Sequence, residues 1–246
     1  MKRQHAAPVT RTRSTCRRRV RRQRVTGATI HLDRTICLSG RSVRLFCVRT
    51  TVETLAKRPP AERLLDTASA LFAEFGIRAV GVDRILADAG VARASLYSSY
   101  GSKDGLVHAY LDRLDHRDRT RWNDAVAGID DPVRRILTFF DLALASAPGR
   151  NFRGCQYANA ATEFPEERME PVLAHREWLL DTLVGLLDQA GVADPEHMAE
   201  RVRLIYDGAL AGSKFEHSTG PIRGGRDLAA ELIEAARDAR RTRVDG

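Results

Sequence analysis

The chain has 246 residues, of which 43% are hydrophobic and 29% are charged. This length and composition are typical of one large or two small globular domains that bury a hydrophobic core. No apolar run approaches the ~20 residues that a membrane-spanning helix needs, so we expect a soluble protein. The four cysteines include no pair at the CxxC spacing of a zinc site, and so low a cysteine content suits the reducing cytoplasm.

Positive charge is concentrated in the first fifth of the chain. Residues 1–50 hold one lysine and 13 arginines against one acid, Asp33, for a net charge of +13. Because the whole chain carries +8, the remaining residues carry −5. The segment has no apolar period and contains a run of like charge over 17–24, so we expect residues 1–55 to form a disordered basic extension. Three interpretations stay open: translation from upstream of the natural start, an arm that grips DNA phosphates, or a targeting segment.

The first ordered element is predicted to be a helix over residues 60–75. Pro59 and Pro60 suit the first turn of a helix, where the missing N–H costs nothing. Six apolar residues then recur at steps of three and four, which gives this helix one buried stripe: Leu64, Leu65, Ala68, Leu71, Phe72 and Phe75. Gly76 follows in the position that glycine favours after a helix.

Two short helices are predicted next, over 83–89 and 93–100. They are joined by a tight turn at Gly90, where a positive φ is easy for glycine. The second helix is left with an exposed face of small, hydroxyl-bearing and basic residues: Arg93, Ala94, Ser95, Tyr97, Ser98 and Ser99. A helix presented in this way fits the major groove of DNA, which is about 12 Å wide. On spacing alone, two packed helices of an ordinary bundle explain the segment equally well.

The rest of the chain is predicted to be helical as well. Ser102 is placed to cap the next helix, with Asp104 in its first turn to complement the helix dipole. Proline and glycine separate the later helices, which we expect over about 103–126, 132–147, 153–164, 167–190, 195–216 and 225–241. No alternating pattern of a β-strand is found, so the predicted fold class is all-α.

Residues 82–106, VDRILADAGVARASLYSSYGSKDGL, resemble the signature of the tetracycline-repressor (TetR) family, and residues 71–76 resemble the end of that family's first helix. The resemblance is specific over about 60–115. It implies an N-terminal three-helix helix-turn-helix DNA-binding domain over 56–104, followed by an α-helical ligand-binding and dimerisation bundle over 105–246. It also implies a homodimeric, cytoplasmic and nucleoid-associated repressor, released from a palindromic operator in double-stranded DNA by a small-molecule effector.

The same resemblance implies which residues touch DNA. Tyr97 and Lys103 lie where family members contact the DNA backbone, and Ser95 lies at a usual hydroxyl contact. The variable positions that read bases are occupied by Arg93, Ala94 and Ser99.

Three residues depart from the family pattern. Leu86 replaces the usual alanine, and Gly105 replaces an acid. We expect Gly105 to loosen its helix by up to ~1 kcal/mol. Asp83 stands where some members have a basic contact, and an acid there would repel phosphate. We expect Asp83 to complement the dipole of its helix instead.

Residues 153–164 resemble the Gly-Cys-x-x-x-Asn-Ala-x-x-Glu motif of one TetR branch. Polar side chains at helical spacing beside small residues suit an apolar cavity with a few fixed polar groups. The ligand-pocket candidates are Trp122, Phe139, Phe140, Cys155, Tyr157, Asn159, Glu163 and Trp178. For the aromatic residues the alternative is plain core packing. For Asn159 and Glu163 it is the pairing of buried backbone groups.

The residues Gly208, Ala209, Ala211 and Gly212 form a small-residue face near the end of the chain. The resemblance implies that two such C-terminal helices from each subunit build the dimer interface, and packing within one chain is the alternative. Cys155 next to small residues suits a buried hydrophobe better than a redox sensor. His108, Asp112 and His116 share one line of a helix, but their charged neighbours favour a solvated face over a metal site.

Other classes of function are weighed against a regulator. No Ser-His-Asp arrangement, phosphate loop or HExxH motif occurs, so we expect neither an enzyme nor a bound cofactor or metal. Asp83 is compatible with an interaction protein that has lost DNA binding, although Tyr97 and Lys103 argue against it. Activation rather than repression of transcription stays open.

Overall fold

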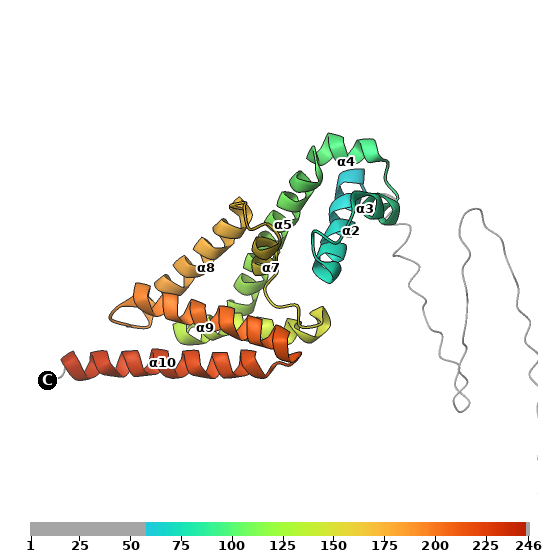
Figure 1. The fold of residues 1–246 in the computed structure, drawn as a ribbon. Coiled ribbons are helices and arrows are strands. Elements are labelled where there is room, and N and C mark those ends of the chain that lie inside the picture. Colours follow the sequence, from blue (N-terminus) through green and yellow to red (C-terminus); the bar gives the residue numbers. More distant parts are fainter. Residues whose placement is uncertain (1–57, 245–246) are drawn as a thin grey trace, which may run out of the picture. The chain divides into compact units, whose positions relative to one another are not determined.

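The computed structural model describes the backbone of residues 58–244 and the side chains of residues 58–239, so the extension predicted over 1–55 lies outside the described residues. Within 58–244 the chain is all-helical and has no strand, which confirms the predicted fold class (Figure 1). The helices in chain order are α2 (Pro60–Phe75), α3 (Val82–Ala89), α4 (Arg93–Tyr100), α5 (Lys103–Val126), α6 (Pro132–Ser146), the short 3₁₀ helix η1 (Pro148–Arg150), α7 (Gln156–Glu163), α8 (Glu170–Gln189), α9 (Pro195–Glu216) and α10 (Gly220–Val244). None of them is long and apolar enough to cross a membrane.

The predicted bounds of the first four helices are confirmed to within one residue. Gly76, Gly90 and Gly101 follow α2, α3 and α4, with φ values of 91°, 61° and 73° that side chains rarely allow. Ser102 caps α5, because its Oγ accepts a hydrogen bond of 3.0 Å from the backbone N–H of Gly105. Local turn and cap chemistry therefore divides this part of the chain into helices.

The structure corrects the predicted start of α7. This helix begins at Gln156 rather than near 153, because Cys155 forms its N-cap. The preceding backbone is not helical: Asn151 and Phe152 have φ values of 50° and 52°, in the left-handed region. The segment before α7 is therefore an irregular connection beside the helix and not its first turn.

α10 begins earlier than predicted, at Gly220 rather than near 225. Pro221 fits the first turn of the helix, and Gly225 continues the helix instead of breaking it. Glycine is required at 225 by close packing, because a Cβ there would lie 2.8 Å from the Cβ of Ala209 on α9. The sequence predicts a loop at these two glycines, whereas Gly225 lies inside the helix and allows α9 and α10 to approach each other.

Two hydrophobic clusters hold the helices together. The first joins α2, α3, α4 and the first half of α5, and it includes four side chains from α7 and α8 or just before them: Tyr157, Ala160, Met169 and Val172. The second joins the end of α5, from Trp122 onward, with α6, α8, α9 and α10. α5 thus contributes to both clusters, and in Figure 1 it runs from α2–α4 to the helices of the second cluster.

Gly105 does not simply loosen α5, as the sequence led us to expect. A Cβ at this position would lie 2.0 Å from the backbone oxygen of Tyr100, the last residue of α4. Since that oxygen belongs to the backbone, it cannot move aside without shifting the whole turn. Gly105 therefore permits the close approach of α4 to the start of α5.

The four small residues predicted to form one face of α9 are split into two that pack inside the protein and two that are exposed. Ala209 is buried, and a Cβ at Gly212 would lie 2.9 Å from the Cβ of Pro221 on α10. The other two small residues are exposed and continue a line of apolar side chains, which we call the α9 stripe: Leu204, Gly208, Ala211 and Phe215. Leu204 is 66% exposed and Phe215 is 82% exposed.

Candidate nucleic-acid interface and ligand cavity

α4 presents to solvent the face that the sequence predicted. Leu96 points into the first cluster and is fully buried. Around it, Ser95 is half-buried, and the remaining predicted contact residues of α4 are exposed: Arg93, Ala94, Tyr97 and Ser99. Tyr97 leaves 50% of its surface exposed, which is uncommon for an aromatic residue. The helix is therefore held on the side of Leu96 and of the half-buried Tyr100, and its opposite side is exposed.

The turn between α3 and α4 is clamped by Arg63 of α2. Its Nε and Nη2 donate to the backbone oxygen of Ala89 at 3.1 and 2.7 Å, and Nη2 also donates to the oxygen of Gly90. Tyr100 adds a second clamp, since its hydroxyl donates to the oxygen of Ala61 at 2.8 Å. The sequence analysis missed Arg63, because no local pattern signals a contact between residues this far apart in the chain.

Arg93, the predicted base reader, forms an ion pair with Asp83 of α3. Both side chains are exposed, so the pair contributes little to the free energy of folding. Asp83, expected to complement the dipole of α3, thus also acts as a counterion for Arg93. To contact a base, Arg93 has to exchange this carboxylate for the DNA.

Lys103, the predicted phosphate contact, lies at the start of α5. Its Nζ donates to the backbone oxygen of Ile77 at 2.8 Å, and burial lowers the pKa of this ammonium group. An ammonium group has three protons, so two remain for a phosphate oxygen after this bond is made. The bond also ties the loop between α2 and α3 to α5.

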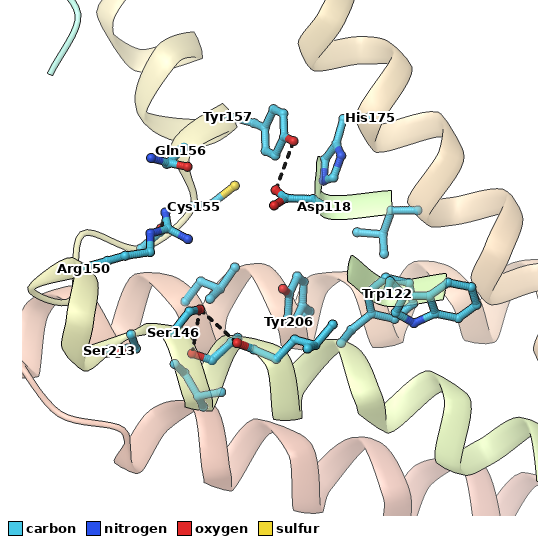
Figure 2. Close-up of a pocket in the computed structure, with 18 of the residues that line it drawn as sticks. Asp118, Trp122, Ser146, Arg150, Cys155, Gln156, Tyr157, His175, Tyr206 and Ser213 are labelled. Atoms are coloured by element: carbon cyan, nitrogen blue, oxygen red, sulfur yellow. Dashed lines mark hydrogen bonds between the residues drawn. The ribbon is translucent and has the colours of Figure 1, made fainter. Parts of the chain in front are cut away.

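A cavity of about 110 Å³ lies among α5, α6, α7, α8 and α9. Figure 2 shows Trp122 at one end of it, Arg150 and Gln156 toward the other, and Tyr206 between them. Besides the imidazole of His175, five rings contribute to the wall: Trp122, Phe139, Tyr157, Trp178 and Tyr206. The ring of Trp122 stacks on that of Phe139 at 5.1 Å and meets that of Trp178 edge-on at 6.1 Å. The wall is therefore largely aromatic.

Polar groups of α5, α7 and α8 meet on one side of the cavity (Figure 2). The Tyr157 hydroxyl donates to Asp118 at 3.2 Å, and burial and the neighbouring carboxylates raise the pKa of this tyrosine. The ring of His175 stacks on that of Tyr157 at 3.7 Å, and its Nδ1 bonds Asp115 at 2.8 Å. Burial lowers the pKa of His175 against the opposing effect of Asp115. A neutral imidazole that donates from Nδ1 keeps Nε2 as an acceptor.

The structure brings five of the predicted pocket residues to the cavity wall: Trp122, Phe139, Cys155, Tyr157 and Trp178. Phe140, Asn159 and Glu163 do not line it. Phe140 is buried behind it, with its ring 5.1 Å from that of Tyr206. Asn159 donates to the oxygen of Arg153 at 2.9 Å and accepts from Lys214 at 3.0 Å. The sequence analysis missed Asp118, Arg150, His175 and Tyr206, which carry no motif and meet only in the folded chain.

α7 connects the cavity wall with α2 and the loop that follows it. Glu163, at the end of α7, accepts a hydrogen bond of 2.6 Å from the backbone N–H of Arg78. Arg153, just before α7, donates to the backbone oxygen of Glu74 at 2.8 Å. The same segment carries Cys155 and Tyr157 on the wall. A displacement of this segment would therefore reach the helix-turn-helix directly.

Comparison with known proteins places these features in one family. The family model described as "Bacterial regulatory proteins, tetR family" matches residues 64–110. A solved TetR-family transcriptional regulator from Streptomyces coelicolor is 32% identical in sequence. The match covers 76% of this chain and 93% of that chain, with a TM-score of 0.64. A TetR transcriptional regulator from Streptomyces avermitilis is 27% identical. The match covers 74% of this chain and 99% of that chain, with a TM-score of 0.61.

Curated relatives match over a part of their length. The HTH-type transcriptional repressor KstR2 of Mycobacterium tuberculosis is 37% identical over 81 residues, which is 31% of this chain. An uncharacterised HTH-type transcriptional regulator of the same species is 32% identical over 77 residues. The chain spans only 38% of the length of either relative. All these proteins are named as regulators and not as enzymes.

Proposed function

Since the chain belongs to the TetR family of bacterial transcriptional regulators, we propose that it is a repressor that binds a palindromic operator as a homodimer and leaves it when a small-molecule effector fills the cavity. In this proposal residues 56–104 bind DNA and residues 105–246 bind the effector and the second subunit. Residues 153–164 further support assignment to the branch with the Gly-Cys-x-x-x-Asn-Ala-x-x-Glu motif. The protein would act in the cytoplasm, on the nucleoid.

The observation that carries DNA binding is the presentation of α4. Its apolar residue Leu96 is buried, its polar face is exposed, and Arg63 clamps the turn before it. The exposed face has the dimensions and chemistry that fit a major groove. In this proposal Arg93, Ala94 and Ser99 read base edges, while Ser95, Tyr97 and Lys103 contact the DNA backbone.

The α9 stripe supports the homodimer. Exposed large apolar side chains in one line are a typical mark of a protein–protein contact. On the neighbouring α10, Leu228 is 46% exposed. Two copies related by a two-fold axis can bury the same surface on both sides, which is the commonest form of homodimer. The pairing would also set two α4 helices at a fixed distance.

Binding to the DNA upstream of the chain's own gene tests this function. A mobility shift should show a complex, and footprinting should show two protected half-sites about 34–36 Å apart, or a multiple of that distance. The spacing follows from a two-fold axis between two α4 helices. Full protection of one unpaired half-site by a single chain would rule out the dimeric mode, and absence of any complex would rule out the function.

Substitutions at Arg93, Lys103 and Asp83 should affect DNA binding in different ways. Arg93→Ala should cost about 1–3 kcal/mol and relax the preference at one base position, because a base contact is lost. Lys103→Ala should weaken binding to all sequences alike and flatten the salt dependence by about one unit per subunit. Asp83→Asn should tighten binding to non-operator DNA, because Arg93 then loses its counterion. Quantitative mobility shifts over a salt series, on operator and scrambled DNA, measure all three.

The matched control is Arg84→Ala, which removes an exposed arginine that pairs with Asp88 on the same helix and lies over the ring of Phe75. If Arg93→Ala weakens operator and scrambled DNA equally, Arg93 contacts the backbone and not a base. If Asp83→Asn leaves non-operator affinity unchanged, the ion pair does not restrain Arg93.

Release by an effector is proposed to act through α5 and α7 together. α5 begins at Lys103, beside the helix-turn-helix, and carries Trp122 of the cavity wall near its other end, so it links the two sites. α7 adds the hydrogen bond from the N–H of Arg78 to Glu163. A ligand that favours one position of these helices would change the distance between the two α4 helices. Major-groove spacing allows little error, so a small shift is enough to lose the fit.

Coupling of this kind is reciprocal and typically about 1–3 kcal/mol. Saturating operator DNA should therefore weaken effector binding by the factor by which the effector weakens DNA binding. Glu163→Ala should reduce that factor several-fold, while Glu166→Ala, an exposed acid three residues later, should leave it unchanged. Calorimetric titration of an effector with and without operator gives the factor. An unchanged factor in Glu163→Ala would show that α7 does not transmit the signal.

A further inference from the structure

Positive charge prevails on the wall of the cavity. Three arginines contribute to the wall, and each donates only to a backbone oxygen: Arg121 to Leu142 at 3.4 Å, Arg150 to Gly154 at 3.1 Å and Arg153 to Glu74 at 2.8 Å. None of the three forms an ion pair with a carboxylate of the described residues. Arg153 turns its guanidinium toward α2, and Arg121 is exposed at the rim. Arg150, which is half-buried, is the cation of the interior.

The carboxylate on the wall already has hydrogen-bond partners. Asp118 is the one carboxylate among the described lining residues, and its two oxygens accept from Tyr157 and Arg117. His175 adds no positive charge near neutral pH, since burial lowers its pKa. A guanidinium in a partly dry site without an acidic partner favours an anionic ligand.

Gln156 is an unsatisfied polar group beside Arg150. Its Oε1 is buried and has no hydrogen-bond partner among the described residues. Figure 2 shows Gln156, Cys155 and Arg150 side by side toward one end of the cavity. A buried amide without a partner costs free energy until a ligand or water pairs with it. Arg150 offers the N–H groups that suit the two oxygens of a carboxylate, whereas Oε1 of Gln156 is an acceptor and pairs only with a donor, such as a water or a ligand hydroxyl.

The opposite end of the cavity is apolar and small. It is enclosed by the rings of Trp122, Phe139 and Trp178, whose centres lie 5.1 to 6.1 Å apart. The whole cavity measures about 110 Å³, against about 150 Å³ for an apolar cavity that accepts a benzene ring, so it admits only a small ligand. The apolar part of such a ligand would lie against these rings.

From this polarity we propose that the effector is a small organic acid, whose carboxylate is held by Arg150 and whose single ring or short apolar chain lies against the rings of Trp122, Phe139 and Trp178. The inference rests on the proposed function and names the ligand class of the same cavity. A neutral ligand would leave Arg150 without an anion. A cationic ligand would meet Arg150 as a like charge.

Three probes of the same size and different charge test the ligand class: phenylacetate, 2-phenylacetamide and 2-phenylethylammonium. Calorimetry on the full chain should show that phenylacetate binds at least tenfold more tightly than phenylacetamide, and that the ammonium probe does not bind. Arg150→Gln should weaken phenylacetate at least tenfold and change phenylacetamide less than twofold, while Arg150→Lys should recover part of the loss. Arg168→Gln, at an exposed arginine outside the wall, is the control and should change nothing.

Equal binding of phenylacetamide and phenylacetate, equal loss of both probes in Arg150→Gln, or failure of all three probes at millimolar concentration would each overturn the proposal. The same probes in the mobility shift separate it from the proposed function. If only the neutral or cationic probe releases DNA, the ligand class is wrong and the repressor function stands. If the chain binds no upstream DNA, the repressor function is wrong, while calorimetry still decides the ligand class.

Discussion

Phe215→Glu should convert the dimer into a monomer and weaken operator binding by about 10²–10⁴-fold, the gain that two linked binding sites usually provide. Phe215 ends the α9 stripe and is 82% exposed in the single chain. A carboxylate there would be buried at the dimer contact without a partner, which is costly. Since the side chain is exposed in the monomer, the fold should not change. Sedimentation gives the oligomeric state, and a mobility shift gives the DNA affinity.

Leu204→Glu, in the same stripe, should have the same effect. The matched control is Leu173→Glu, which introduces the same charge at a leucine of α8 that is 37% exposed and lies outside the stripe. A Phe215→Glu protein that remains dimeric would show that the α9 stripe is not the interface. A monomer that keeps full operator affinity would contradict the requirement for two α4 helices.

Gly105→Ala should lower the free energy of unfolding by about 3 kcal/mol, at the upper end of what overpacking costs. Alanine usually stabilises the interior of a helix by up to ~1 kcal/mol relative to glycine. Here the added Cβ would lie 2.0 Å from the backbone oxygen of Tyr100, so the turn between α4 and α5 has to open. Because α4 would shift with that turn, operator binding should fall as well. Urea unfolding followed by circular dichroism measures the stability.

Gly185→Ala is the matched control. Gly185 is an exposed glycine inside α8, and a Cβ there would meet no atom within 4 Å. This substitution should raise the free energy of unfolding by up to ~1 kcal/mol. If both alanines stabilise the protein, the contact with Tyr100 is relieved at little cost and Gly105 is an ordinary helical glycine.

The helix boundaries could be predicted because their causes are local. Gly76, Gly90 and Ser102 act within one turn of the chain, and each ends or begins the helix where the sequence indicates. Gly225 was misjudged because its role depends on Ala209, which lies on another helix. A glycine that breaks a helix and a glycine that lets two helices meet look the same in one sequence.

The orientation of α7 could not be predicted. Helical spacing shows that Asn159 and Glu163 share a face, but not which neighbour that face meets. α7 has a cavity on one side and α2 with its following loop on another. The structure turns Glu163 to the loop and Tyr157 to the cavity. Arg150 could not be identified as a pocket residue either, because it meets the other lining residues only in the folded chain.

The first hydrophobic cluster has a consequence for exchanging parts between relatives. Its side chains come from α2–α5, but also from α7 and α8 through Tyr157, Ala160 and Met169. A chimaera joined at residue 104 would set the helix-turn-helix of one protein against the α7 of another, with mismatched volumes in a shared core. The residues that pack the helix-turn-helix are thus discontinuous in sequence. New operator preferences are best transplanted as the exposed residues of α4 alone, which contribute nothing to that core.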